Sequence, residues 1–176
     1  GRLSSHDRDV IGAARLLADA GGGAVVLLAF SGPDGPRDGF EEAGADRVMT
    51  LARPEFLGYA PEARMAAVVA VAAALGIRHV LFPDTVVAGG DVGRRVAIRL
   101  NDRAAGNVQR VAADGLVRRG RGGRSDFASA LPKVLLIAPE AADPVVDERF
   151  EARALDPVVF TVDARLRDRG LASTDP

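Results

Sequence analysis

The residue types most capable of binding chemistry gather in one short stretch, residues 84–95, which is DTVVAGGDVGRR. Backbone N–H groups at the start of a helix attract anions, and Arg94 and Arg95 would add positive charge there. The candidates for holding a nucleotide phosphate are Asp84, Gly89, Gly90, Asp91 and Arg94. The stretch contains neither G-x-x-x-x-G-K-[ST] nor G-x-G-x-x-G, so a second interpretation stays open. In that interpretation, Gly89 and Gly90 only permit a tight turn.

The neighbouring residues predict how this stretch is positioned. Residues 79–82 form a short apolar run, which predicts a buried strand. Asp91 stands where the N-cap of a helix belongs, and Val92, Val96, Ala97 and Leu100 then follow at helical spacing. A strand, a loop and a helix in this order are typical of a parallel α/β sheet, whose contacts gather at the carboxyl ends of its strands. We therefore expect the loop 84–91 to be the contact surface of the domain.

The rest of the chain predicts an α/β fold with three layers, α/β/α, and a mainly parallel sheet. We expect helices from Ser4 and Ser5 to the glycines at 21–23, over residues 40–43, and over residues 61–75. Further strands are predicted over residues 24–30, 47–51, 133–138 and 158–162, with 24–30 and 133–138 central in one sheet. The Asp114-Gly115 pair predicts an antiparallel hairpin between 108–112 and 116–119, in the C-terminal third.

Composition excludes several classes of function. The chain has 176 residues, a net charge of −1 and no cysteine, so it offers no thiolate metal site and no basic footprint for nucleic acid. No apolar run reaches membrane-spanning length and no signal peptide is recognisable, so we expect a cytoplasmic protein that does not contact membranes. His6 and His79 are the only histidines, and neither has a second imidazole at metal-ligand spacing. Without a G-x-S-x-G elbow or another catalytic arrangement, we do not expect an enzyme.

The stretch also resembles a known family. Alpha subunits of electron transfer flavoproteins carry a G-x-(D/N)-L-x-x-R-x-A-x-x-L helix, which Gly90, Asp91, Arg95, Ala97 and Leu100 match here. The flanking segments 1–22, 41–62, 114–126 and 131–144 are similar to the first domain of those subunits. The segments GRLSSHDRD and FLGYAPE resemble in particular the alpha subunits that serve dehydrogenases of methylated glycines, such as dimethylglycine.

The resemblance implies a domain over residues 1–170 with the adenine nucleotide alpha hydrolase-like fold, followed by a flexible tail, 171–176. It implies an architectural part of a heterodimer with the beta subunit, which carries electrons from flavoprotein dehydrogenases to a downstream acceptor. Nothing after Pro157 resembles the family's FAD-binding second domain. FAD is therefore expected in the complete protein and not in this chain alone, and no metal is expected. The alternative is a stand-alone adenine-nucleotide-binding module of the same fold, which would use the loop 84–94.

One further implication concerns the sheet. The resemblance places a buried strand directly before the segment GRLSSHDRD, so either a preceding segment supplies this strand or another element fills its place. A sheet without this strand would expose apolar neighbours and the hydrogen-bonding groups of strand edges.

Overall fold

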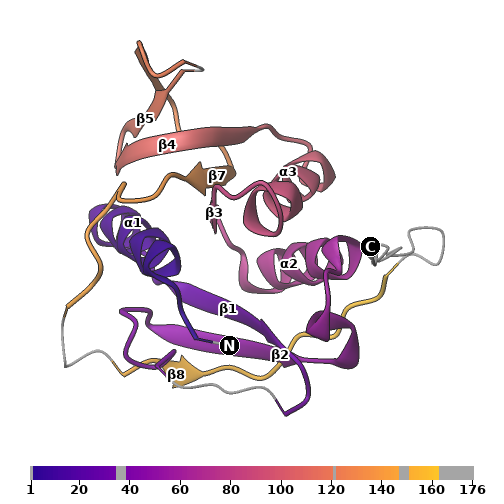
Figure 1. Cartoon of the computed structure of the whole chain (residues 1–176). Coiled ribbons are helices and arrows are strands. Elements are labelled where there is room, and N and C mark those ends of the chain that lie inside the picture. Colours follow the sequence, from indigo (N-terminus) through magenta and orange to yellow (C-terminus); the bar gives the residue numbers. More distant parts are fainter. Residues whose placement is uncertain (1, 35–38, 121, 147–150, 163–176) are drawn as a thin grey trace, which may run out of the picture.

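The computed structural model describes residues 2–34, 39–120, 122–146 and 151–162. Its strands lie between helix α1 (Ser5–Gly21) on one side and helices α2 (Pro61–Leu75) and α3 (Gly89–Arg99) on the other (Figure 1). The predicted three-layer α/β fold is confirmed. The predicted tail, 171–176, and the last part of the predicted domain lie outside the described residues.

The helices form where local signals place them. The Ser4 side chain accepts a hydrogen bond from the Asp7 amide, and the Asp7 carboxylate accepts one in return from the Ser4 amide, so a capping box starts α1. Helix α2 begins at Pro61 and ends at Gly76, whose φ of 62° is the left-handed value that glycine adopts without strain. The helix predicted over 40–43 is wrong, because those residues form turns.

The first sheet has the order β1-β2-β8, and its strands are parallel. They are β1 (Val26–Ser31), β2 (Arg47–Ala52) and the two-residue β8 (Arg153–Ala154). The strand predicted over 158–162 is wrong. These residues run without a ladder, and Val158, Phe160 and Val162 pack on the apolar cluster beneath α2.

The second sheet has the order β3-β7-β4-β5-β6. Its strands β3 (Val80–Pro83), β7 (Val134–Ile137) and β4 (Ala104–Ala112) are parallel. Strands β5 (Gly115–Arg119) and β6 (Asp126–Ser129) continue the sheet antiparallel. The pairing of β4 with β5 confirms the hairpin at Asp114-Gly115, although it lies near the middle of the chain and not at its C-terminal end. Strand β6 was not predicted.

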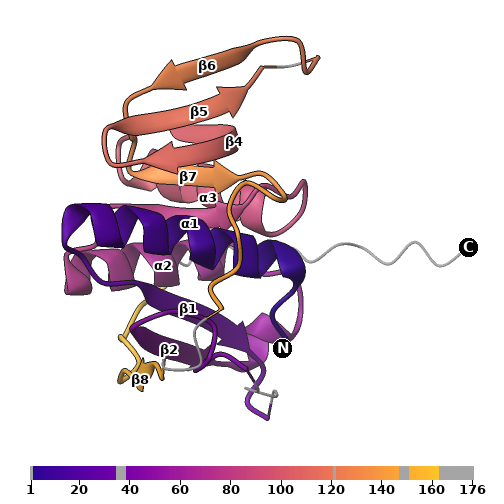
Figure 2. The ribbon, with the colours of Figure 1, turned by 90° about the vertical axis from the view of Figure 1, so that its left-hand side faces the viewer.

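The prediction that residues 24–30 and 133–138 belong to one sheet is wrong. Strand β1 is the edge of the first sheet, and β3, beside β7, is the edge of the second. Between these two edges lies a cavity of about 760 Å³, lined mainly by apolar residues of α1, β1, α2 and β3. Helix α1 lies across the space between the sheets (Figure 2). The sheets are separate because no described strand pairs with the facing edges of β1 and β3.

Both sheets nevertheless share one helical cover on each face. On the α1 face, Ala18 packs with Val25, just before β1, and with Leu27 of β1, and Ala13 packs with Leu135 of the second sheet. The other face packs beneath α2, whose apolar stripe is core as predicted. Among the described helices, none combines the length and the apolar character needed to span a bilayer.

Candidate functional site

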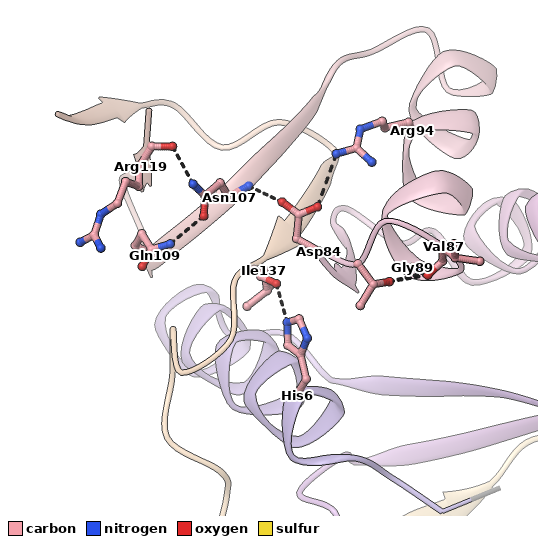
Figure 3. A network of polar contacts seen from close by, with 10 residues as sticks. His6, Asp84, Val87, Gly89, Arg94, Asn107, Gln109, Arg119 and Ile137 are labelled. Atoms are coloured by element: carbon pink, nitrogen blue, oxygen red, sulfur yellow. Dashed lines mark hydrogen bonds and ion pairs between the residues drawn. The ribbon is translucent and has the colours of Figure 1, made fainter. Parts of the chain in front are cut away.

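The candidate site is the loop 84–88, which joins β3 to α3 at the carboxyl ends of the parallel strands. The Asp84 amide donates a hydrogen bond to the Ile137 carbonyl, 2.8 Å away at the end of β7. The same carbonyl lies 2.7 Å from Nε2 of His6, in the first turn of α1 (Figure 3). The strand ends and the start of α1 therefore meet at one edge of the sheet, where open α/β domains make their contacts.

The start of α3 differs from the prediction. The N-cap is Ala88, with φ 77° and ψ −101°, and Asp91 lies inside the first turn, so the N-cap assignment of Asp91 is wrong. Thr85 takes over the capping role, because its Oγ1 accepts the Gly89 amide at 3.1 Å and its carbonyl accepts the Gly90 amide at 3.1 Å. The Thr85 hydroxyl also donates to the Val87 carbonyl. Sequence reasoning missed Thr85, although a hydroxyl residue shortly before a glycine pair is a capping signal.

The two glycines serve this turn. A Cβ atom at Gly89 would lie 2.3 Å from the Pro83 carbonyl oxygen, and one at Gly90 would lie 2.2 Å from the Thr85 carbonyl oxygen. Both amides are already hydrogen-bonded within the loop. A pyrophosphate needs free amides and an open approach, so this helix start does not fit the pyrophosphate of FAD. Phosphate binding by the five candidate residues stays a prediction, and the geometry favours the tight turn.

Asp84 ties the loop to the hairpin of β4 and β5. Its Oδ2 accepts the Asn107 amide at 2.6 Å, and its Oδ1 lies 3.4 Å from a guanidinium nitrogen of Arg94. Asn107 has φ 53° and occupies an irregularity of β4, where the register with β7 shifts. Its side chain accepts from Gln109 and donates to the Arg119 carbonyl (Figure 3). Asp84 therefore fixes a bulge, and no sequence signal marked Asn107 as its partner.

Asp91 faces inward and holds α2 against α3. The Tyr59 hydroxyl donates to its carboxylate, and Nε of Arg95 lies 3.1 Å from both carboxylate oxygens. Arg95 also pairs with Glu62 of α2. We call these four residues the clamp. Asp91 and Arg95 are paired with each other and with other members of the clamp. Of the two arginines predicted to add positive charge, Arg94 and Arg95, only Arg94 points toward the loop.

The clamp shifts the pKa values of its members. Burial by itself raises the pKa of Asp91, but hydrogen bonds from Tyr59 and Arg95 and the charge of Arg95 outweigh it, and the pKa lies below its ordinary value. The hydrogen bond to Asp91, assisted by burial, raises the pKa of Tyr59. Burial lowers the pKa of Arg95, yet the bond to Asp91 and the nearby carboxylates raise it overall. At neutral pH, Asp91 and Arg95 are therefore ionised and Tyr59 is protonated.

The loop presents apolar side chains outward. Val86 is 92% exposed and Val87 is 54% exposed, at the tip between the anchored Asp84 and the start of α3. The Arg94 side chain is about half exposed beside them. This surface therefore consists of two valines and the Arg94 guanidinium on a turn that the hydrogen bonds of Asp84 hold in place. Such a surface suits contact with another protein better than capture of a phosphate.

The other candidates have structural partners. The rings of His6 and His79 contact the backbone carbonyls of Ile137 and Pro132. Over the described part of the chain, no three His, Asp or Glu side chains are grouped to hold a metal ion. In the arginine-rich segment 118–124, Arg119 pairs with Asp126 at 3.2 Å, whereas Arg121 lies outside the described residues.

Comparison with known proteins decides the family. Residues 1–165 match the family described as Electron transfer flavoprotein domain. The chain belongs to this family. It is also 41% identical over 189 residues to the electron transfer flavoprotein subunit alpha of Chromohalobacter salexigens. That similarity covers the whole of this chain and 44% of the relative, so the electron transfer flavoprotein domain described here spans less than half of the relative's length.

The family assignment confirms the main prediction from the sequence, the first domain of an electron transfer flavoprotein alpha subunit. It also agrees with the parallel α/β architecture around the loop. The matched helix motif acquires a physical explanation: its Asp91 and Arg95 are members of the clamp, and Gly90 closes the turn at Thr85.

Proposed function

We propose that this domain is the architectural part of an electron transfer flavoprotein alpha subunit and docks against the beta subunit with the loop 84–91. The complete heterodimer carries electrons from flavoprotein dehydrogenases to a downstream acceptor. One observation supports the docking role above the others. The helix start behind the loop is closed by Thr85, while Val86 and Val87 project from a turn that Asp84 anchors.

In this proposal, the domain performs no redox chemistry itself. FAD belongs to the part of the alpha subunit beyond this chain, since the glycine-rich helix start described here does not fit a pyrophosphate. The domain holds that part in place and presents a protein-binding surface. No catalytic residue and no metal are assigned to it.

Two finer assignments complete the proposal. The segments GRLSSHDRD and FLGYAPE support a dehydrogenase partner that demethylates methylated glycines such as dimethylglycine. The second assignment is a cytoplasmic location, which agrees with a sequence that has no cysteine. Reduction of the assembled flavoprotein by a dimethylglycine dehydrogenase, compared with an acyl-CoA dehydrogenase as donor, tests the first assignment.

Docking is tested by titrating the purified beta subunit into this chain in a calorimeter. The double variant Val86→Ser/Val87→Ser is compared with Val159→Ser, a matched control whose side chain is 90% exposed elsewhere on the domain. We expect the double variant to weaken binding about tenfold or more, because apolar contacts at the centre of an interface dominate its free energy. The control should bind like the wild type. Equal affinity of all three proteins would refute docking through this loop.

The cofactor assignment has its own readout. The chain purified alone should show no flavin absorbance near 370 and 450 nm (roughly where free flavin absorbs), because a dinucleotide needs a glycine-rich cradle of free amides. Flavin that co-elutes with the chain in stoichiometric amount contradicts the assignment. This outcome is independent of the calorimetric titration.

A further inference from the structure

Charge is distributed unevenly along the chain. Residues 80–137, which contain α3 and the whole second sheet, include ten basic and five acidic residues and so carry a net charge of +5. Because the whole chain carries −1, the residues outside this stretch carry −6. A charge separation of this size produces a potential that extends beyond single contacts and attracts an oppositely charged partner. The second sheet is therefore the cationic part of the domain.

Most acidic side chains of this stretch are engaged within the domain, whereas several arginines reach solvent. Four of the five acidic residues accept hydrogen bonds from other residues of the domain: Asp84, Asp91, Asp102 and Asp126. Arg110 and Arg118 are exposed, and neither forms an ion pair with another described residue. The charge that this part of the molecule offers to a partner is therefore positive.

The two faces of the hairpin formed by β4 and β5 have different surroundings. Val111 and Leu116 are partners in the register, and they pack in the same apolar cluster as Ala13 of α1. Successive side chains of a strand point to opposite faces. Arg110, the neighbour of Val111, therefore lies on the other face, on the side of the sheet where α3 lies (Figure 1). Its partner in the register is Val117.

This face of the hairpin adjoins the docking loop. Asp84 of the loop lies between Arg94 and Asn107 and contacts both. The side chain of Asn107 donates to the Arg119 carbonyl at 2.9 Å (Figure 3). Arg119 and Val117 are two residues apart in β5, so their side chains share the face that carries Arg110. The hairpin face therefore continues from the loop without an intervening element.

We propose that this face of the hairpin, with Arg94, Arg110 and Arg119, continues the docking surface of the loop 84–91 and binds an acidic surface of the beta subunit. The side chains of Arg94 and Arg119 are 55% and 48% exposed, so both remain accessible beside their carboxylate partners. Exposed arginine together with apolar side chains and few free carboxylates is the composition of protein interfaces. The inference rests on the proposed docking of the loop and adds the chemistry of the partner.

The variants Arg110→Glu and Arg118→Glu form a matched pair for the test. Both residues are exposed, lie in neighbouring strands and change the net charge equally, but they occupy opposite faces of the hairpin. Affinity and association rate of the beta subunit are measured by surface plasmon resonance at about 50 and 500 mM NaCl, since salt screens contacts between exposed charges. Arg110→Gln, which removes the charge without reversing it, is a milder variant. Thermal melts check that each variant is folded.

At low salt, we expect Arg110→Glu to weaken binding about tenfold or more, and Arg110→Gln to fall between it and the wild type. Most of this difference should vanish at high salt, and Arg118→Glu should bind within about threefold of the wild type. Equal effects of Arg110→Glu and Arg118→Glu overturn the proposal. A wild-type affinity that does not depend on salt overturns it as well.

Two comparisons separate this inference from its alternatives. If Val86→Ser/Val87→Ser binds like the wild type and Arg110→Glu does not, docking through the loop fails and the contact lies on the hairpin face alone. The reverse result retains docking of the loop and overturns the hairpin contact, and a wild type that does not bind refutes both. A labelled oligonucleotide of about 20 nucleotides, at about 150 mM salt, tests for a polyanion in place of an acidic protein. We expect no saturable change in its anisotropy, and saturable binding that Arg110→Glu abolishes would overturn the proposal in favour of nucleic acid.

Discussion

Strands β3 and β7 are parallel neighbours of four residues each, yet they differ in burial. All four residues of β7 are 0% exposed, because β3 and β4 flank the strand and helices cover its faces. All four residues of β3 are partly exposed, because one side of the strand faces the cavity. Leu81 and Leu135 are partners in the register and belong to one apolar cluster, so the contrast arises from neighbours and not from residue type.

The difference in burial between β3 and β7 shows that an apolar run in the sequence specifies a strand but not the position of that strand in a sheet. A residue is removed from water by the strands on either side as well as by the helices above and below. The expected hydrophobic contribution of Leu81 is therefore smaller than that of Leu135, in proportion to the area that each loses to solvent.

The largest expected effect is a direct measurement of this contrast. Leu135→Ala should lower the free energy of unfolding by about 2–5 kcal/mol, because it leaves a cavity in a fully buried position. Leu81→Ala should cost about 1–2 kcal/mol, because its surroundings are already open on one side. Urea denaturation of the two variants measures both values. Equal costs would mean that the cavity beside β3 does not weaken this strand.

Variants of the clamp should have a smaller effect on the free energy of unfolding. The clamp joins α2 and α3, which cover the same face of β3 and β7. Tyr59→Phe should cost about 1–2 kcal/mol at neutral pH, because Asp91 loses a charge-assisted hydrogen bond. Arg95→Lys is the companion variant, since it keeps the charge and loses the paired geometry. The free energy of unfolding from urea titrations tests both. If Tyr59→Phe unfolds like the wild type, the clamp does not hold the helices together.

The hydrogen bond between Tyr59 and Asp91 predicts that the stability of the domain depends on pH. The folded pKa of Asp91 is depressed, so its contribution is present above about pH 4 and is lost as pH falls through the folded pKa. The folded pKa of Tyr59 is raised, so its contribution is present below about pH 10 and is lost as pH rises through the folded pKa. The stability difference between wild type and Tyr59→Phe should therefore be constant between about pH 5 and 9 and shrink on either side. A difference that changes steeply near pH 7 would contradict this assignment.

A still smaller effect concerns the carboxyl end of β3. Asp84→Asn keeps an acceptor for the Asn107 amide and removes the charge that faces Arg94, so it should cost about 0.5–1 kcal/mol. Asp84→Ala removes the acceptor as well and should cost more. Thermal melts of the two variants give the order. If the two variants have the same melting temperature, the bulge at Asn107 does not depend on the hydrogen bond to Asp84.

Much of the fold was predictable because its signals are local. Ser4 with Asp7, Pro61 with Gly76, and Asp114 with Gly115 each mark a boundary within a few residues, and the structure confirms them. The division into two sheets was not predictable from the runs 24–30 and 133–138, because pairing depends on which strands lie between them. The prediction of a strand over 158–162 is wrong because sequence does not show pairing. Apolar residues that cover a core have the same pattern as a strand, although they form no hydrogen bonds to a neighbouring strand.

The candidate site was predicted in place but not in detail. The loop 84–91 lies at the carboxyl edge as expected, and its glycines have the role of the tight turn. The capping by Thr85 and the bond from Asn107 to Asp84 join residues whose relation appears only after folding. Asp91 was assigned to the cap because it is acidic near a helix start, whereas its partner Tyr59 lies just before another helix, α2, and its other partner Arg95 also pairs with Glu62 of α2.

A thermal melt of the wild-type chain with adenine nucleotides tests whether the loop 84–91 faces protein, as we propose, or a nucleotide. A ligand present at a hundred times its Kd stabilises a folded protein by about 2.7 kcal/mol, which raises the melting temperature of a domain of this size by several degrees. With millimolar AMP or ATP, we predict an unchanged melting temperature, because Thr85 already satisfies the amides of Gly89 and Gly90. A rise of several degrees that saturates with nucleotide concentration would contradict docking of this loop against protein and favour the nucleotide-binding alternative.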